Sequence, residues 1–341
     1  MEEKTYSAAI IGTGRIGFSL GLDEKREQPA SHTMAILENK RIFLESAADT
    51  NAENLEKWKN YVLSKNPSVK IYKTSLELFS AHVPDIVVVS VNEDAHLEEC
   101  LCAINARPRL VILEKPVALN SLEAQKIEQA AKEKNVPVMV NHERRFSADY
   151  RAAKDFLSKI GEIQSVRASL CSGLRVWAKE FENDGAYSLL HDGTHLVDIV
   201  HFLLGVDLSK ETPVVTGIVR DEKGIVRNFS AHYQTEKISE IQFSMSGRSR
   251  FFSFDVEILG TIGKICIGNG YAKFYERKES KLYTGFYSLE SVELPLPKKT
   301  GYFSGMIQNA VDFLDGTSAL GSTLQDATKD LLVLEAIKAH F

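Results

Sequence analysis

The sequence lacks the features that mark secreted, zinc-binding and membrane-spanning proteins. Only four of its 341 residues are cysteines, none in a C-x-x-C pair and none followed by histidine at zinc spacing. We therefore expect reduced thiols and neither a disulfide framework nor a zinc site. No apolar run approaches the roughly 20 residues that cross a membrane. Met1-Glu2-Glu3-Lys4 leads into the first expected strand without a signal peptide, so we expect a cytoplasmic protein. The cysteines are Cys100, Cys102, Cys171 and Cys266.

Charge of one sign is also lacking. The formal net charge is −5, with no long block of either sign, which argues against a nucleic acid or an acidic membrane as partner. The sequence contains no internal repeat and no low-complexity segment. Its content of 44% hydrophobic and 26% charged residues is ordinary for a globular protein. The length favours two domains and allows a large core.

One glycine-rich turn has the spacing of a dinucleotide fingerprint. The apolar run 8–11 is followed by three glycines in G-x-G-x-x-G order, which predicts a strand, a tight turn and a helix start. The helix N-terminus would present free N–H groups to a pyrophosphate. Alone, the pattern also fits a plain strand-to-helix turn. The candidate cofactor contacts here are Gly12, Gly14, Arg15, Ile16 and Gly17.

The first part of the chain alternates strands and helices. Between residues 6 and 140, apolar strands and amphipathic helices follow one another, a pattern that predicts a doubly wound parallel sheet. The run Asp85–Val91 is apolar on both faces, as expected of a strand covered by helices on both sides. A polar insertion, 21–30, interrupts the first helix, and we expect it to form a flap near the cofactor. Ser31 is the expected N-cap of the helix that follows.

The pattern changes near residue 146. Strands without long helices between them occupy about 213–296, which predicts an antiparallel or mixed sheet, and two amphipathic helices close the chain. We expect an α/β Rossmann dinucleotide-binding domain over 1–145. An α+β substrate-binding and oligomerisation domain is expected over 146–341, with its C-terminal helices packing back toward the first domain.

Three polar residues follow the expected second and fourth strands, at the edge where open α/β sheets bind ligands. Asp49 ends the second strand, 32 residues after Gly17; a carboxylate there would bind the adenosine ribose and repel a 2′-phosphate, so we expect NAD rather than NADP. The alternative interpretation of Asp49 is an acidic residue in a solvated turn at the end of a strand. Asn92 would bind the cofactor or act as a helix N-cap, and His96 would face the cofactor.

The expected fifth strand ends in Glu114-Lys115-Pro116, and Glu114 and Lys115 are candidate cofactor contacts. A lysine beside a nicotinamide would bind a substrate hydroxyl and favour hydride acceptance by the oxidised ring. Together, G-T-G-R-I-G, E-K-P and N-H-E-R-R-F at 141–146 resemble the Gfo/Idh/MocA oxidoreductases, the family of glucose–fructose oxidoreductase and inositol dehydrogenase. The resemblance extends over essentially the whole chain, including Leu259-Gly260-Thr261-Ile262-Gly263.

The resemblance also implies a catalytic helix. In that family a D-x-G-x-H-x-x-D segment carries the histidine that takes the proton of the substrate hydroxyl, and Gly193, His195 and Asp198 match it. His191 stands where the family has its first aspartate. Asp192 would replace that acid as the partner of His195, or His191 would line the site and alter substrate choice.

A metal site is the competing interpretation of this helix. His191 and His195 have the i, i+4 spacing of a zinc pair, but the H-E-x-x-H glutamate is missing. We therefore expect no metal, and place His201 on another face of the helix.

Five further residues are candidates for the substrate site. Four cations would hold a polyhydroxyl or anionic substrate, and the alternative for each is a solvated basic edge. Trp177 would stack on a sugar ring or plug the domain interface. The cations are Arg144, Arg145, Arg175 and Lys179.

These observations predict an NAD(P)-dependent oxidoreductase that moves hydride between nicotinamide and a secondary hydroxyl of a sugar, cyclitol or sugar nucleotide. Lys115 would hold the substrate oxygen and His195 would act as general base. The alternatives are a non-catalytic NAD-binding regulator, and a lyase or glycosidase that oxidises its substrate transiently. The family resemblance implies a homodimer or homotetramer.

Overall fold

The computed structural model describes residues 4–172 and 186–341. The chain divides into two compact units. The first unit comprises residues up to Ser147 together with Lys299–Thr328, and the second comprises Ala148–Lys298 together with Lys329–Phe341. The division falls inside the last helix, α10 (Leu324–Lys338).

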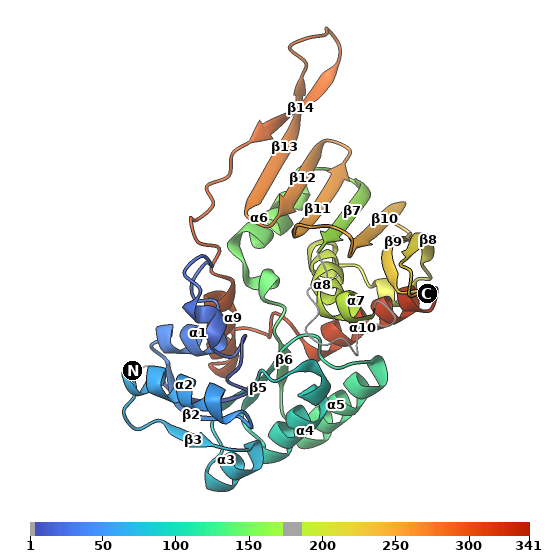
Figure 1. The fold of residues 1–341 in the computed structure, drawn as a ribbon. Helices are drawn as coiled ribbons and strands as arrows, with labels where there is room; N and C mark the ends of the chain where they lie inside the picture. The colour runs from blue at the N-terminus through green and yellow to red at the C-terminus, as the bar shows by residue number, and fades with distance from the viewer. Residues whose placement is uncertain (1–3, 173–185) are drawn as a thin grey trace. The chain divides into compact units, whose positions relative to one another are not determined.

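The first unit is built on a six-stranded parallel sheet (Figure 1). Its order, β3-β2-β1-β4-β5-β6, reverses direction between β1 and β4. In open α/β sheets this reversal opens a crevice at the carboxyl ends of the strands, where ligands bind. The strands are β1 (Tyr6–Ile11), β2 (Ile42–Ala48), β3 (Lys70–Tyr72), β4 (Ile86–Val89), β5 (Leu110–Leu113) and β6 (Val138–Val140).

Helices cover both faces of this sheet, which is why every residue of β4 and β5 is buried. The α-helices are α1 (His32–Glu38), α2 (Ala52–Leu63), α3 (Ser75–Ala81), α4 (His96–Ala106), α5 (Ser121–Lys134) and α9 (Tyr302–Leu314). Short 3₁₀ turns lie at η1 (Ser19–Leu22), η2 (Glu93–Ala95) and η3 (Glu143–Phe146). The predicted doubly wound parallel sheet is confirmed.

The polar insertion leaves the first helix and returns to it. Where α1 begins, the N–H groups of His32 and Thr33 donate to the carbonyls of Ile16 and Gly17, so α1 continues the turn that the insertion interrupts. Ser31 caps α1 by accepting a hydrogen bond from the Met34 N–H, as predicted. The insertion is therefore a loop on an otherwise continuous helix.

The far end of this loop is anchored by Glu27. Its carboxylate accepts hydrogen bonds from the N–H groups of Thr300 (2.9 Å) and Gly301 (2.6 Å), just before α9. The Tyr302 hydroxyl donates to the Glu27 carbonyl. The loop thus packs on the segment where the chain re-enters the first unit; its role as a flap near a cofactor stays a prediction.

The second unit is built on an eight-stranded sheet of order β14-β13-β12-β11-β7-β10-β9-β8. Its strands are antiparallel except for β7 and β10, which pair in parallel, so the sheet is mixed. The strands are β7 (Ile163–Cys171), β8 (Val214–Arg220), β9 (Val226–Tyr233), β10 (Glu240–Ser246), β11 (Ser253–Gly260), β12 (Gly263–Gly268), β13 (Tyr271–Glu279) and β14 (Tyr287–Val292).

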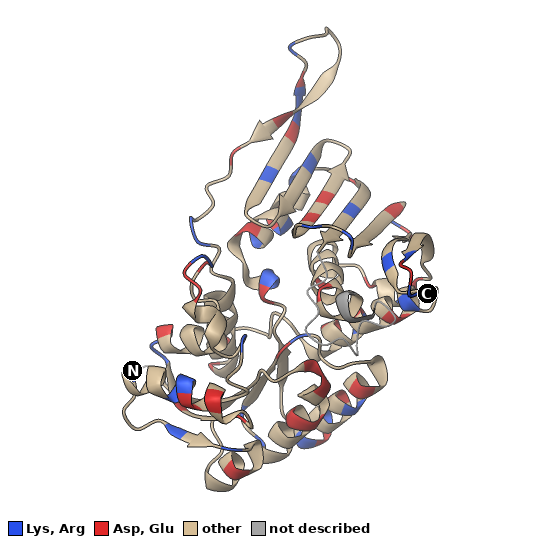
Figure 2. Cartoon of the chain, viewed as in Figure 1, with Lys and Arg blue, Asp and Glu red and all other residues tan. Residues whose placement is uncertain are grey.

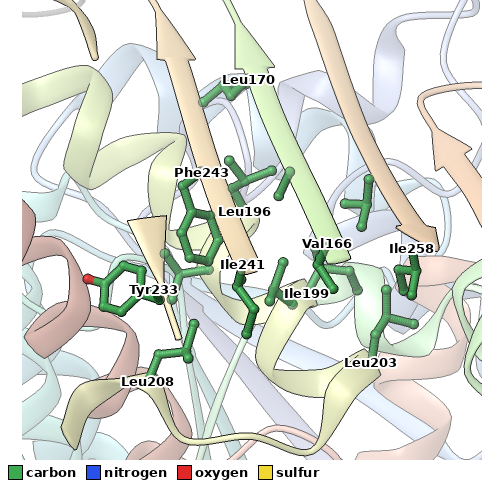
Figure 3. Packing of buried hydrophobic residues seen from close by; sticks show 14 of the residues in the cluster. Val166, Leu170, Leu196, Ile199, Leu203, Leu208, Tyr233, Ile241, Phe243 and Ile258 are labelled. Carbon is green, nitrogen blue, oxygen red and sulfur yellow. The ribbon is translucent and has the colours of Figure 1, made fainter. Parts of the chain in front are cut away.

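One face of this sheet carries the core of the second unit. Apolar side chains alternate along the central strands, and α8 (Gly193–Leu204) packs its apolar side against them (Figure 3). Leu196, Ile199 and Leu203 of α8 lie against Val166 and Ile241 of the sheet. The remaining helices are α6 (Ala148–Phe156), α7 (Ala186–His191) and the short turns η4 (Leu157–Lys159) and η6 (Leu208–Lys210).

The last two strands, β13 and β14, form a two-stranded extension whose bounds the sequence did not predict. β13 runs from Tyr271 to Glu279, and β14 pairs with its second half. β12 pairs with β13 only as far as Glu276, so the outer part is a two-stranded arm that projects beyond the rest of the sheet (Figure 1).

The surface charges are mixed. Figure 2 shows Lys and Arg interspersed with Asp and Glu across the strands of the second sheet. Within residues 4–172 and 186–341, no helix combines the length and apolarity needed to cross a membrane.

Candidate active site

The glycine turn follows β1 directly and lies beside the end of β4. Gly12 has a φ of +90°, and a Cβ built there would lie 2.6 Å from the Ser90 carbonyl oxygen. A Cβ on Gly17 would lie 2.1 Å from the Gly12 carbonyl oxygen. The packing of the protein itself therefore requires glycine at both positions.

Gly14 is different. Among the described residues, the nearest atom to a Cβ at Gly14 is Asn54 Nδ2, at 3.9 Å, so nothing in the chain's own packing excludes a side chain. A helical turn begins here, because the Gly14 carbonyl accepts hydrogen bonds from the N–H groups of Phe18 and Ser19. A glycine facing open space at a helix start fits the close approach of a pyrophosphate. The turn that carries Arg15 and Ile16 thus fits the dinucleotide that the sequence predicts.

Asp49, at the end of the β2 strand, supports this turn. One carboxylate oxygen accepts hydrogen bonds from the Thr13 N–H (2.7 Å) and the Thr13 hydroxyl (2.8 Å), and the other accepts from the Asn51 N–H (2.7 Å). Asp49 is partly exposed, so its remaining lone pairs can still accept bonds from a ribose. The carboxylate has a bracing role, which neither sequence interpretation included.

A cavity of about 420 Å³ lies beside this turn. It is bounded by Thr13, the first helical turn and η1 on one side, and by α2 on the other. Its size suits part of a nucleotide. The lining residues are Thr13, Phe18, Ser19, Leu22, Asn54, Lys57, Asn60 and Tyr61.

Asn92 and His96, which follow β4, differ in their burial and in their contacts. Asn92 is exposed and occupies the N-cap position of η2, where, within the described chain, its side chain makes no capping hydrogen bond. His96 is buried, with Nδ1 2.6 Å from the Pro116 carbonyl and Nε2 3.2 Å from the Val91 carbonyl. Burial lowers the pKa of His96 although both carbonyls favour its charged form. His96 joins the loops after β4 and β5; contact with a cofactor stays a prediction for both residues.

Glu114 and Lys115 follow β5. Lys115 is half-buried, whereas Glu114 is 4% exposed. The Glu114 Oε1 atom lies 2.6 Å from His32 Nε2 and accepts a hydrogen bond from Asn141 Nδ2, also at 2.6 Å. Burial alone would raise the pKa of Glu114, but these bonds and the Lys115 charge hold it below its ordinary value.

The residues after β6 add a second acid. Loss of water around the Glu143 carboxyl raises its pKa, although the charges of Arg144 and Lys115 oppose this. Burial, followed by the charge of Glu143, raises the pKa of Tyr302 to about 12. Glu143 is thus a candidate polar group near Lys115 that the sequence interpretation missed. Glu143 acts on Tyr302 through its charge, and the two residues are too far apart in the sequence for a local pattern to relate them.

The two arginines here differ. The Arg145 side chain is buried and donates through Nη1 to Asp326 (3.0 Å) and to the Gly321 carbonyl (3.2 Å). It therefore ties η3 to the first turn of α10 and to the segment before that helix, rather than forming a solvated edge. Arg144 is half-buried. A substrate contact stays a prediction for Arg144 and Arg145.

In the second unit, the predicted catalytic helix is two helices. α7 ends at His191, Asp192 forms the junction, and α8 begins at Gly193. A Cβ on Gly193 would lie 3.0 Å from Met245 Cε and 3.2 Å from a Leu334 methyl, so this glycine lets α8 pack closely. His191, Asp192 and His195 are half-buried, whereas Asp198 is 1% exposed.

His201 lies two turns further along α8. Its Nδ1 is 2.8 Å from an Asp330 carboxylate oxygen, and its Nε2 accepts the Leu208 N–H at 3.2 Å. Both ring nitrogens therefore act within the second unit. Arg175, Trp177 and Lys179 lie outside the described residues.

The comparisons with known proteins place the first unit. Residues 6–142 match the GFO_IDH_MocA family model, described as an oxidoreductase family with an NAD-binding Rossmann fold. The chain is 28% identical over 183 residues to a 1,5-anhydro-D-fructose reductase of Ensifer adhaerens, covering 48% of this chain and 54% of that protein. It is 27% identical over 146 residues to a scyllo-inositol 2-dehydrogenase (NADP(+)) of Bacillus subtilis, covering 41% and 40%.

These alignments span about half, or less, of the length of the curated relatives. A solved structure, a putative myo-inositol dehydrogenase from Sinorhizobium meliloti, has a TM-score of 0.76 at 17% identity, with 99% of this chain and 98% of that chain covered. That likeness shows the two-domain fold. The predicted fold class and the family resemblance are confirmed.

Alanine variants of Gly12 and Gly14 are expected to have opposite effects on stability and on NAD binding. Gly12→Ala is expected to destabilise the protein by about 3 kcal/mol or more, because it combines a positive φ with a backbone clash. Gly14→Ala is expected to change stability by less than about 1 kcal/mol. It should nevertheless weaken NAD binding about tenfold or more, because the added methyl occupies the cofactor's path. Urea unfolding measures the change in stability, and calorimetric titration measures the affinity for NAD. Normal NAD binding by Gly14→Ala would contradict the assignment of the glycine turn to the pyrophosphate.

Proposed function

We propose that this chain, in which residues 6–142 are the NAD-binding Rossmann domain of the Gfo/Idh/MocA oxidoreductase family, is an NAD(P)-dependent dehydrogenase. Its substrate would be a secondary hydroxyl of a sugar, cyclitol or sugar nucleotide. The observation that carries the proposal is the glycine turn Gly12–Gly17, which faces open space at Gly14. It lies in the same unit as Lys115, which follows the end of β5. The names of the relatives, an anhydrofructose reductase and an inositol dehydrogenase, support this substrate class.

Each residue has a defined part in the proposal. The turn at Gly12–Gly17 holds the pyrophosphate, and Asn92 and His96 border the cofactor. When bound, the nicotinamide supplies the hydride-accepting centre. Lys115 binds the substrate oxygen through its ammonium, and His195 takes the hydroxyl proton.

The partner of His195 is proposed to be Asp192. As the residue before α8 it stands three positions before His195, and residues three apart lie on one side of a helix. A carboxylate there would orient the imidazole and stabilise its protonated form. His191, Arg144 and Arg145 are proposed to contact the substrate hydroxyls.

Variants of Lys115 and His195 test the catalytic assignment. Lys115→Ala and His195→Ala are each expected to lower kcat about 100-fold or more, because each removes a group that acts on the reacting oxygen or its proton. NAD affinity should change little, because neither residue belongs to the glycine turn. The measurement is the appearance of reduced nicotinamide with a panel of sugars, inositols and nucleotide sugars.

Two surface variants serve as controls. Lys132→Ala removes an exposed lysine of α5, and His232→Ala removes a half-buried histidine of β9; both should keep normal turnover. Near-normal activity of Lys115→Ala or His195→Ala would overturn the assignment. Tightly held NAD with substrate conversion but no net reduction would favour a lyase or glycosidase instead.

We propose NAD as the preferred cofactor because the Asp49 carboxylate stands at the end of β2, where a 2′-phosphate would meet its charge. Asp49→Asn keeps an acceptor for the Thr13 N–H but removes the charge. It is expected to shift the ratio of NADP to NAD affinity about tenfold toward NADP, since like charges no longer meet. Titration of both cofactors measures this. An unchanged ratio would mean that Asp49 only braces the turn.

We also propose a homodimer or homotetramer. The two-stranded arm of β13 and β14 exposes large apolar side chains at its tip. They include Leu282 (81% exposed) and Phe286 (66% exposed). Such patches usually mark an interface.

The double variant Leu282→Ser/Phe286→Ser is expected to reduce the oligomer mass measured by light scattering, because it removes the apolar surface that a second copy would cover. Leu122→Ser, a similarly exposed position on α5, is the control and should leave the mass unchanged. A double variant with the mass of the unmodified chain would exclude the arm from the interface.

A further inference from the structure

A buried polar cluster lies directly behind Lys115. His32, Glu114 and Asn141 are 0%, 4% and 1% exposed, and they come from α1, the end of β5 and the end of β6. His32 Nε2 and Asn141 Nδ2 both lie 2.6 Å from the same Glu114 oxygen, Oε1. The other oxygen, Oε2, accepts the Lys115 N–H at 3.3 Å. Both oxygens of Glu114 therefore have donors within the protein.

Glu114 is held in its ionised form within the cluster. Burial of a carboxyl favours its neutral form, but two side-chain donors directed at one oxygen stabilise the ionised form. In this cluster the hydrogen bonds and the Lys115 charge prevail. An ionised Glu114 requires His32 to present Nε2–H as a donor, so the tautomer of the imidazole is fixed by its partner.

A purely structural role explains the cluster poorly. A buried charged group usually stabilises a fold less than apolar residues of similar volume would. This one lies next to Lys115, which is proposed to bind the reacting oxygen of the substrate. His32 also belongs to the helix that continues the glycine turn, since its N–H donates to the Ile16 carbonyl. The cluster therefore joins the cofactor turn to the Lys115 strand end.

We propose that His32 and Asn141 are positioning residues that hold Glu114 as a buried carboxylate, which in turn fixes the main chain and the ammonium of Lys115 against the substrate oxygen. This inference rests on the proposed function, because it assigns a role through Lys115. It adds three roles: His32 and Asn141 as donors, and Glu114 as an inward-facing charge rather than a cofactor ligand.

The first test compares two variants of His32. His32→Leu removes the donor and keeps much of the volume, whereas His32→Gln places an amide donor near the position of Nε2. His32→Leu is expected to lower kcat roughly 10- to 100-fold, with KM and NAD affinity changed less than about threefold, because a small displacement of a positioning group acts on the reacting step. His32→Gln should recover most of the loss.

Asn66→Leu is the matched control. Asn66 is a buried amide in the same unit, and its Nδ2 donates to the Leu44 carbonyl at 2.9 Å, away from Lys115. This variant should lower the urea midpoint as His32→Leu does, yet keep kcat. If His32→Leu fails to fold, Asn141→Ala removes the second donor and is expected to give the same loss of kcat.

A second readout needs no substrate. Glu114→Gln removes the charge that is proposed to hold the Lys115 ammonium in place, so the side chain should be released toward the reagent. Acetic anhydride should then acetylate Lys115 about threefold faster, or more, at fixed pH, as measured by mass spectrometry against Lys132 in the same sample. An unchanged acetylation rate would overturn the inference.

The outcomes separate the two proposals. If Lys115→Ala keeps its turnover, the proposed function fails and this inference fails with it. If Lys115→Ala is inactive while His32→Leu and Asn141→Ala keep normal kcat, only the inference fails. Equal losses in His32→Leu and His32→Gln would also overturn it, because a restored donor should restore the rate.

Discussion

The structure of the first unit depends on one close approach between two backbones. The turn after β1 passes so near the end of β4 that a Cβ on Gly12 would lie 2.6 Å from the Ser90 carbonyl oxygen. The Ser90 hydroxyl donates to the Gly12 carbonyl at 2.8 Å, and the Ser90 N–H donates to the Ile11 carbonyl. This contact fixes the two central strands at the point where the strand order reverses. The ends of all the neighbouring strands are placed relative to it.

From that contact, polar groups gather at one edge of the sheet. Asp49 braces Thr13 inside the glycine turn, and His96 joins the loops that follow β4 and β5. His32 reaches Glu114 from the helix that resumes after the insertion. These bonds tie separate loops together, so the edge that faces a ligand is held by buried polar pairs rather than by the loops' own conformation.

The second unit meets a different requirement. A large sheet needs an apolar layer on its covered face, and α8 supplies it. His195 lies in the first turn of α8, while His191 ends α7 and Asp192 joins the two helices. Gly193 allows this helix to approach Met245 and Leu334 closely. The glycine of the family's motif therefore has a packing explanation that is independent of chemistry.

The sequence by itself determined the glycine turn, the alternation of strands and helices to residue 140, the antiparallel or mixed sheet that follows and the resemblance to the family. Each of these depends on local spacing and periodicity, which a chain carries wherever it folds. The tertiary structure alone decided that His32 meets Glu114, that Arg145 is held by Asp326 and that β14 completes an arm. Their partners lie tens to hundreds of residues away, and such bonds arise only when packing brings distant segments together and burial makes an unpaired polar group costly.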